Sequence, residues 1–347
     1  MRSLMTLVVP CYNEEKALPL FMAAVAPIRK ALAEGHYVTP AGEALDFEPC
    51  DTELVFADDG SADCTLKLLR SFHEADPGVR YVSFSRNFGK EAGIYAGLKE
   101  AKGDYVVLLD ADLQHPVESI PVMYKTLTTE TIAFPDKENS VRGHYDSVAM
   151  YRNKRKSDGK IRAFFSKGFF KLINRLSGLS LVDGATDFRM MTGQMVQSVL
   201  SMNEYNRFTK GIFNWVGYNT KWMPYDDAER CAGDSKWTTA GLIRYGFEGI
   251  FAFSTKPLTI AFGLGLLLCI LAVIYAIYTV ISTLVFGNPV DGYPSIFTMV
   301  LLFGGIQLLF LGFLGQYMSR MYLETKHRPI YILKETSEEK NCSGSSI

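Results

Sequence analysis

Two stretches near the C-terminus contain no Asp, Glu, Lys or Arg, and they constrain the fold of this chain more than any other feature. The first runs from Pro257 to Val290 and the second from Gly292 to Ser319. The hydrocarbon core of a bilayer is about 30 Å thick, which a helix of roughly 20 apolar residues can span. Leu258–Phe286 and Ile296–Met318 both reach that length, so we expect two transmembrane helices. The alternative is a pair of buried core helices, but charge-free runs of this length are uncommon in soluble domains.

Charges around these stretches predict their orientation. The link between them lacks Lys and Arg, whereas cations flank the outer ends: Arg244, Lys256, Arg320, Lys326, Arg328 and Lys334. The positive-inside rule then places both termini in the cytoplasm and Asp291 outside. We therefore expect a cytoplasmic region 1–235, a juxtamembrane amphipathic segment 236–257, the helix pair 258–319 and a cytoplasmic tail 320–347. The tail is rich in Ser, Glu and Lys from Glu335 onward, which predicts disorder.

The region before Lys256 has the composition of an ordinary globular protein. The whole chain carries 36 Lys and Arg against 37 Asp and Glu, which argues against a uniformly basic nucleic-acid-binding protein. With 48% hydrophobic and 21% charged residues, it is not a disordered chain. Its six cysteines are scattered without a CxxC spacing, so we predict neither a zinc site nor a dense disulfide framework.

Short apolar runs alternate with helix-like segments in this region. Strands are expected at Met5–Val9, Glu53–Ala57, Val79–Phe84 and Tyr105–Leu109. Helices are expected at Ala17–Ala33, Thr65–Glu74 and Glu91–Ala101. The alternation predicts βαβ units and hence an α/β fold with a Rossmann-like, mostly parallel sheet. Gly35–Cys50, with its Pro and Gly residues, is expected to be a surface excursion.

Three of the expected strands end in polar sequences: Pro10–Glu14, Asp58–Ser61 and Asp110–Pro116. Ligands of parallel sheets bind at the carboxyl ends of the strands, so these sequences predict a nucleotide pocket. Asp110 and Asp112 are two residues apart, which sends both side chains to the same side of an extended chain. Two carboxylates held together need a cation, and oxygen ligands suit Mg²⁺ or Mn²⁺. A solvated acidic turn is the alternative.

Other charged positions have both functional and structural interpretations. Asp58 and Asp59 can cap the next helix or bind a ribose or base. Arg86–Lys90 opens a helix, whose N-terminus attracts anions, unless it is a solvated basic turn. Asp187 and Arg189 form either a site or an internal ion pair. The loop Arg230–Trp237 carries two cations and is either a lid over a diphosphate or an ordinary surface loop.

Cations and aromatic residues interleave between Arg152 and Arg175. Such a segment suits a membrane interface, where cations meet lipid phosphate and aromatic side chains enter the apolar layer. The cations expected at this surface are Lys154, Arg155, Arg162, Lys167 and Lys171. A helix packed on the domain is the main alternative, and RNA binding is a weaker one.

The order of the motifs resembles a known family. Along the chain stand VPCYNEE, FADDGSADCT, SRNFGKEAG, LLDADLQHP, TDFRM, RCAGDSKW and FSTKPL, followed by the two apolar stretches. This order is similar to that of family 2 inverting glycosyltransferases of the GT-A fold. Within them it resembles the polyprenyl-phosphate hexose synthases, which include bactoprenol glucosyltransferases and dolichyl-phosphate mannose synthases. The resemblance extends from about Met5 to Leu333.

The resemblance implies roles for individual residues. Those implied to line the nucleotide-sugar pocket are Pro10, Tyr12, Glu14, Ala57, Asp58 and Asp59. Asp110, Ala111, Asp112 and Gln114 would hold the metal ion and the diphosphate, with the metal on Asp110, Asp112 and Gln114. Arg152, Arg230 and Lys236 would contact phosphates. Asp187 stands at the position proposed for the family's catalytic base, with Arg189 beside it, and Asp112 is the third residue expected to act in catalysis.

The resemblance also implies a reaction and partners. A hexose would pass from a nucleotide sugar, with UDP-glucose expected, to polyprenyl phosphate, undecaprenyl phosphate in a bacterium, with inversion. The protein would lie in the bacterial inner membrane as a homo-oligomer, a tetramer by resemblance, and bind no nucleic acid. The acceptor phosphate is largely ionised at neutral pH because its second pKa is about 6, so we expect Asp187 to orient its neighbours rather than remove a proton.

Some positions depart from the family pattern, and two other functions stay open. Thr186 and Met190 replace the usual Gly and Leu around the Asp-x-Arg sequence, and Val117 replaces a common Pro. Gly35–Cys50 is longer than the usual connection. None of these departures removes a charged group. The alternatives are a glycosyltransferase with another nucleotide sugar or acceptor in cell-envelope polysaccharide synthesis, and a non-catalytic nucleotide-binding membrane adaptor.

Overall fold

The computed structural model of the chain describes residues 2–132, 143–153, 182, 184–226, 254–286 and 292–338. Two compact units make up the chain. The first contains residues 1–170, 180–238 and 329–347, and the second contains residues 171–179 and 239–328. The chain therefore leaves the first unit before the two apolar stretches and returns to it after them.

A mixed sheet of eight strands forms the centre of the first unit, in the order β11-β9-β10-β6-β1-β4-β5-β12. The strands are β1 (Ser3–Cys11), β4 (Cys50–Asp58), β5 (Val79–Phe84), β6 (Tyr105–Leu108), β9 (Ser147–Arg152), β10 (Ala185–Thr192), β11 (Thr220–Tyr225) and β12 (Leu333–Thr336). β1 runs parallel to β4 and β6, and β4 runs parallel to β5, whereas β10 is antiparallel to both of its neighbours. The expected α/β class with a mostly parallel sheet is confirmed.

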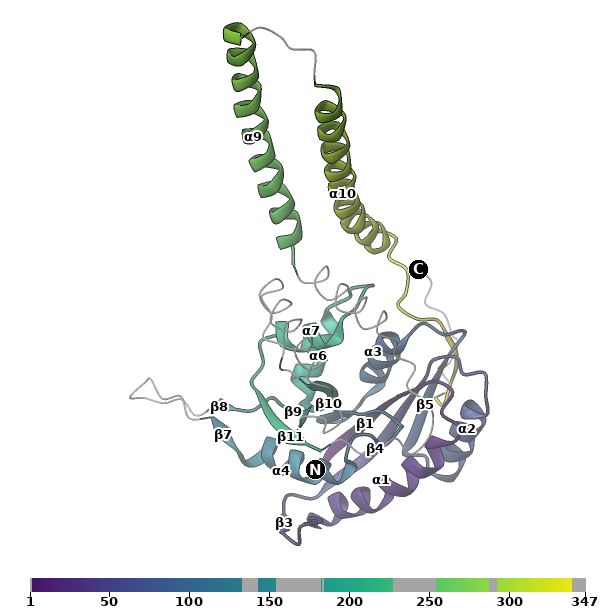
Figure 1. Ribbon diagram of the computed structural model, residues 1–347. Coiled ribbons are helices and arrows are strands. Elements are labelled where there is room, and N and C mark those ends of the chain that lie inside the picture. Colours follow the sequence, from purple (N-terminus) through teal and green to yellow (C-terminus); the bar gives the residue numbers. More distant parts are fainter. Residues whose placement is uncertain are drawn as a thin grey trace. The chain divides into compact units, whose positions relative to one another are not determined.

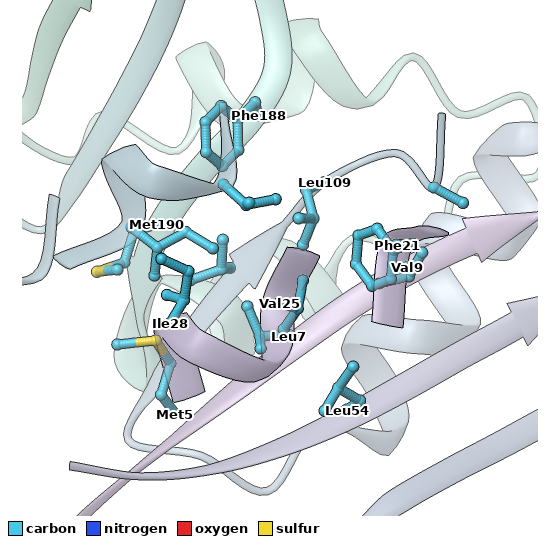
Figure 2. Close-up of a cluster of buried hydrophobic side chains, with 14 of the residues drawn as sticks. Met5, Leu7, Val9, Phe21, Val25, Ile28, Leu54, Leu109, Phe188 and Met190 are labelled. Carbon is cyan, nitrogen blue, oxygen red and sulfur yellow. The ribbon is translucent and has the colours of Figure 1, made fainter. Parts of the chain in front are cut away.

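One face of this sheet is covered by α1 (Ala17–Glu34), α2 (Thr65–Ala75) and α4 (Ile120–Thr129), the last preceded by the 3-10 turn η1 (Val117–Ser119). Because side chains alternate along a strand, Met5, Leu7 and Val9 all leave β1 toward this face. They meet apolar residues of α1, among them Phe21 and Val25, in a fully buried core (Figure 2).

The other face of the sheet carries α3 (Lys90–Glu100), which contacts α6 (Gly193–Ser201). Ala92 and Ala96 of α3 are buried against Ala57 and Phe84. Small residues allow α3 to approach β1 closely, since a Cβ added at Gly97 would lie 2.3 Å from Cγ1 of Val8. This close approach places the first residue of α3, Lys90, near the carboxyl ends of the central strands.

The expected central strands and the three expected helices are all present, with ends that differ by only a few residues. Gly35 ends α1 in the left-handed conformation, with φ of 74°. The excursion that follows contains a small hairpin of β2 (His36–Val38) and β3 (Ala44–Asp46). The remaining elements of this unit are β7 (Thr131–Ile132), β8 (Gly143–His144) and α7 (Thr209–Trp215).

The segment after the apolar helices differs from expectation. The sequence predicts disorder from Glu335 onward, but Glu335 and Thr336 belong to β12, which pairs antiparallel with β5 at the edge of the sheet. Arg70 donates to both carboxylate oxygens of Glu335, and the Tyr81 hydroxyl donates to Oε1 at 2.7 Å. The Arg70 hydrogen bonds, opposed by partial burial, lower the pKa of Glu335 to about 2. The prediction was wrong for this segment because a polar strand can be ordered by partners distant in sequence.

The second unit contains two long helices, α9 (Lys256–Phe286) and α10 (Tyr293–Thr325), which run side by side in Figure 1. Each contains a window that is long and apolar enough to cross a membrane, Leu258–Tyr275 and Leu302–Thr325. Neither window is buried inside the protein. The two apolar stretches are thus helical, as the sequence predicts.

Candidate functional site

The loops after β1 and β4 are joined at the carboxyl end of the sheet. The backbone N–H of Asn13 donates to the Ser61 hydroxyl, and the Asn13 side-chain oxygen accepts from the N–H of Ala62, both at 2.9 Å. Asn13 has a left-handed backbone, with φ of 54°, which Asn tolerates better than most residues. Two of the three polar sequences therefore form one surface, as we expected.

The candidate pocket residues on these strands differ in exposure. Pro10 and Ala57 are neighbours in the register of β1 and β4, and Ala57 is fully buried. Tyr12 is exposed and Glu14 is half-buried, so both side chains are accessible beside the strand ends. The residues expected to line the pocket thus include both buried and solvent-accessible positions.

Asp58, the last residue of β4, and Asp59, the next residue, both accept hydrogen bonds from backbone N–H groups. Asp58 is fully buried and accepts hydrogen bonds from the Ser61 N–H at 3.1 Å and the Ser83 hydroxyl at 2.7 Å. Asp59 accepts from the N–H groups of Phe88 at 2.6 Å and Gly89 at 2.9 Å. Burial raises the pKa of Asp59, and these N–H groups partly offset that effect. Asp59 thereby positions the loop that precedes α3, and Asp58 holds the loop after β4 and the side chain of Ser83 in β5.

Lys90, the first residue of α3, bridges two carboxylates. Its ammonium lies 2.8 Å and 2.9 Å from the two oxygens of Asp110, just after β6. It also lies 2.9 Å from Oδ2 of Asp187 in β10. β6 and β10 are adjacent antiparallel strands, which explains how residues 77 positions apart in sequence share one cation. The sequence indicated a basic helix start here but did not identify this bridge.

Asp187 lies in a strongly positive environment. Burial alone would raise its pKa, but the charges of Lys90, Lys210 and Arg189 hold the pKa well below its usual range. The buried Arg189 guanidinium stacks over the ring of Phe213, 3.9 Å from the ring centroid. Burial lowers the pKa of Arg189 to about 10, against the opposing effect of Asp187. The positive surroundings of Asp187 therefore favour its ionised form and reduce its basicity.

Asp112, Gln114 and Arg152 lie close to each other beside Asp110. Asp112 Oδ1 accepts from the Gln114 N–H at 3.1 Å, and the Arg152 guanidinium donates to the Gln114 side-chain oxygen at 3.4 Å and to the Tyr225 hydroxyl at 3.2 Å. Ala111, between the two Asp residues, is buried. The carboxylate and amide oxygens form a hard donor set that suits Mg²⁺ or Mn²⁺.

This donor set is incomplete as a protein-only metal site. Within the described part of the chain, no group of three His, Cys, Asp or Glu side chains is arranged to hold a metal ion. Mg²⁺ is often held by only one or two carboxylates, with water and substrate phosphate as its other ligands. The residues present therefore fit a metal that is shared with a diphosphate.

His115 follows the acidic sequence but is part of the core. Its ring stacks on Phe188 with centroids 5.2 Å apart and meets the Tyr225 ring edge-on. Burial lowers its pKa, so the ring is neutral at physiological pH. The described structure thus supports a packing role for His115.

Several of the expected site residues lie outside the described residues. Arg230 and Lys236 of the expected lid are among them. So are the expected membrane-surface cations Lys154, Arg155, Arg162, Lys167 and Lys171. Their roles stay predictions from the sequence.

Comparison with known proteins identifies relatives over nearly the full chain. A bactoprenol glucosyl transferase of Shigella phage SfV is 37% identical over 334 residues, covering 96% of this chain and 99% of the relative. A prophage bactoprenol glucosyl transferase homolog of Escherichia coli K12 is 37% identical over 333 residues, with 96% and 99% covered. Among solved structures, glucosyl-3-phosphoglycerate synthase from Mycobacterium tuberculosis aligns with a TM-score of 0.41 at 17% identity, covering 72% of this chain and 77% of the other.

A family model matches more than half of the chain. Residues 6–200 match glycosyl transferase family 2, and this range contains β1, β4 and β6 with the carboxylates at their ends. The match agrees with the resemblance that the order of the motifs indicates. The chain therefore belongs to glycosyl transferase family 2 and is a sugar-transferring enzyme.

Proposed function

We propose that this protein transfers glucose from a nucleotide sugar to a polyprenyl phosphate at a membrane. The observation that carries the proposal is that Asp110 and Asp187 meet at the carboxyl end of the central parallel strands, with Asp112 two residues after Asp110, in a chain with two membrane-length helices. The near full-length similarity to bactoprenol glucosyl transferases supports the acceptor and the sugar. Bactoprenol is a polyprenyl lipid, and its phosphate requires an enzyme at the bilayer surface.

UDP-glucose is the donor that we propose. Its nucleotide would lie on the joined loops after β1 and β4, beside Pro10, Tyr12, Ala57 and Asp59. Glu14, half-buried at the same edge, would lie near the ribose. The guanidinium of Arg152 would face the diphosphate, as would Arg230 and Lys236 of the lid. The accessibility of Tyr12 and Glu14 beside the buried Ala57 supports this placement.

A divalent cation, Mg²⁺ or Mn²⁺, would be held by Asp110, Asp112 and Gln114. When bound, it would offset the negative charge that develops on the leaving diphosphate. Phosphate oxygens and water would complete its coordination, because the described protein oxygens alone do not. The donor and the metal would therefore bind together.

Transfer would proceed by direct displacement. A phosphate oxygen of the acceptor attacks the anomeric carbon, the bond to the diphosphate breaks, and the configuration inverts to give a β-linked product. The acceptor phosphate is largely ionised at neutral pH, since its second pKa is about 6. Asp187 has a pKa well below its usual range and is a poor proton acceptor. Its proposed role is to orient Lys90 and Arg189.

The connectivity of the chain supports the membrane topology that we propose. α9 and α10 lie between the first unit and β12, and β12 pairs with β5 of that unit. A chain that leaves a domain and returns to it must cross a bilayer an even number of times. Two crossings with the flanking cations inside put both termini in the cytoplasm and Asp291 outside. Segment 154–176 would lie at the inner surface, where its cations would meet the lipid phosphate.

The assembly expected from the family resemblance is a homo-oligomer, and a tetramer is the form that we propose. Its measurement is the mass of the purified full chain in detergent by light scattering. A monomer at working concentration would contradict this part of the proposal.

The decisive experiment is transfer of label from a panel of radiolabelled nucleotide sugars to undecaprenyl phosphate. The full chain in detergent or membranes should convert UDP-glucose into a product that is extracted into organic solvent. EDTA should abolish the product, and added Mn²⁺ or Mg²⁺ should restore it. Labelling from another nucleotide sugar alone would favour the alternative donor, and binding of UDP-glucose without turnover would favour a non-catalytic adaptor.

A further inference from the structure

The cation between Asp110 and Asp187 is a lysine of the protein itself. Its ammonium donates a hydrogen bond to Oδ2 of Asp110 at 2.9 Å and lies at ion-pair distance from Oδ1 of Asp110, 2.8 Å, and Oδ2 of Asp187, 2.9 Å. Both oxygens of Asp110 are therefore in direct contact with this ammonium. Asp110 is also the residue whose oxygens would bind the divalent cation of the proposed function.

The backbone of Lys90 is held at the start of a helix, and its ammonium is carried on a flexible side chain. The N–H groups of the two preceding residues, Phe88 and Gly89, donate to Asp59, which fixes the start of α3. The Lys90 side chain is 45% exposed and has a flexible four-carbon stem, so a shift of its ammonium between the two carboxylates would not require the helix to move. Asp187, only 16% exposed, offers a second partner that is more enclosed than Asp110 at 29%.

We infer that Lys90 competes with the divalent cation for Asp110, and that metal binding shifts its ammonium onto Asp187. This inference rests on the proposed function, because it takes Asp110 as a metal ligand. Lys90 is then a positioning residue. It keeps the two carboxylates together before the metal binds, and it stays as the partner of Asp187 afterwards.

The physical basis is that the ammonium lies within 3 Å of both Asp110 oxygens, where a metal ion bound to this carboxylate would be close to it, and two cations so close repel each other. Hydrogen bonds between charged groups are stronger than neutral ones, so the contact with Lys90 must weaken metal binding. A neutral residue of similar length would remove this competition. The competition also makes the donor diphosphate important, because its oxygens supply ligands that the ammonium does not occupy.

The test measures Mn²⁺ binding to the full chain in detergent by electron paramagnetic resonance, without and with UDP. Lys90→Met should bind Mn²⁺ about tenfold more tightly than the unmodified protein, as expected for loss of a charged hydrogen bond. Lys90→Arg, which keeps the charge, should bind within about threefold of the unmodified protein. Adding Asp110→Asn to Lys90→Met should remove the gain.

Lys210→Met is the matched control for charge. Lys210 also lowers the pKa of Asp187, but its ammonium donates to the Ala185 carbonyl oxygen at 3.2 Å. If Lys90 acts only as a distant positive charge, both Met variants should tighten Mn²⁺ binding equally. Direct competition predicts a clearly larger effect for Lys90→Met.

Three results would overturn the inference without overturning the metal site. They are unchanged or weaker Mn²⁺ binding by Lys90→Met, an equal gain in Lys210→Met, and a gain that survives Asp110→Asn. Absence of Mn²⁺ binding by every variant would overturn the metal site together with this inference, while the extraction assay would still test sugar transfer. Thermal unfolding verifies that each variant is folded, and Lys90→Gln serves as a second neutral variant if Lys90→Met is not.

Discussion

Some side chains at the carboxyl end of the sheet hold the loops in place, and others are positioned to bind a ligand. Asp58 and Asp59 accept hydrogen bonds from backbone and hydroxyl groups and thereby shape the site. Asp110 and Asp187 share the ammonium of Lys90. All are acidic residues near strand ends, so their roles are separated only by burial and by the partners that each carboxylate finds.

Asp112→Asn is expected to reduce transfer more than Asp187→Asn. Loss of an electrostatic stabiliser of the transition state costs on the order of 100-fold or more in rate, whereas an orienting residue costs less. Because the pKa of Asp187 is well below its usual range, this carboxylate stays ionised between about pH 5 and 9. Its loss should therefore not alter the shape of the pH–rate profile. Initial rates in the extraction assay measure the activity of the two variants and its dependence on pH. Equal losses of rate in the two variants across the pH range would contradict this ranking.

Gly60→Ala should disrupt the loop after β4. Gly60 has φ of 66°, and an added Cβ would lie 2.5 Å from the Arg86 carbonyl carbon. Gly42→Ala is the matched control, since its φ is 84° but nothing lies within 4 Å of the added Cβ. Backbone strain costs about 1 kcal/mol at both positions. Thermal unfolding should show a substantially larger loss for Gly60→Ala, and UDP binding should weaken only in that variant. Equal effects would show that the close contact with Arg86 is unimportant.

The edge strand β12 has a polar sequence, and specific side-chain contacts hold it and the residues before it to the rest of the first unit. Arg70 and Tyr81 hold Glu335, and the Tyr331 ring stacks on Phe84 at 4.7 Å between centroids. The lowered pKa of Glu335 means that its attachment is complete above the usual Glu pKa, near 4.3. It weakens as the pH falls toward about 2. Acid should therefore loosen this strand.

Tyr331→Ala should destabilise the first unit by about 1 to 3 kcal/mol, because it removes a large, partly buried ring from the Phe84 cluster. Ile332→Ala is the matched control. Its side chain is 53% exposed, and its backbone oxygen, which accepts from the Ser85 N–H, is retained. Chemical unfolding of the full chain in detergent gives both values. A larger loss for Ile332→Ala would contradict the assigned packing.

At the scale of the whole molecule, the chain returns to the first unit through β12 after α9 and α10. This connectivity makes the proposed membrane topology testable. In a cysteine-free background, Cys at Gly292 should react with a membrane-impermeant maleimide added to intact cells. Cys introduced at Lys326, just beyond the C-terminal end of α10, should react with the maleimide only after the cells are permeabilised. The expectation follows from an even number of crossings and from the flanking cations. The opposite labelling pattern would overturn the proposed orientation.

Much of the fold was predictable from local patterns. Short apolar runs located the central strands, helix-like segments between them located α1, α2 and α3, and the absence of charge located α9 and α10. Polar clusters at strand ends indicated the site, because parallel strands present their carboxyl ends at one edge. The predictions of strands and helices succeed because they depend on neighbours within a few residues along the chain.

Only the tertiary structure decided which charges meet. Lys90, Asp110 and Asp187 come from three separate elements, and their contact depends on how close α3 lies to the sheet and on the pairing of β10 with β6. The formation of β12 as an ordered strand likewise depends on Arg70 and Tyr81, which are more than 250 positions away in sequence. Hydrophobic periodicity carries no information about such partners, because the strength of an ion pair depends on distance in space and on burial.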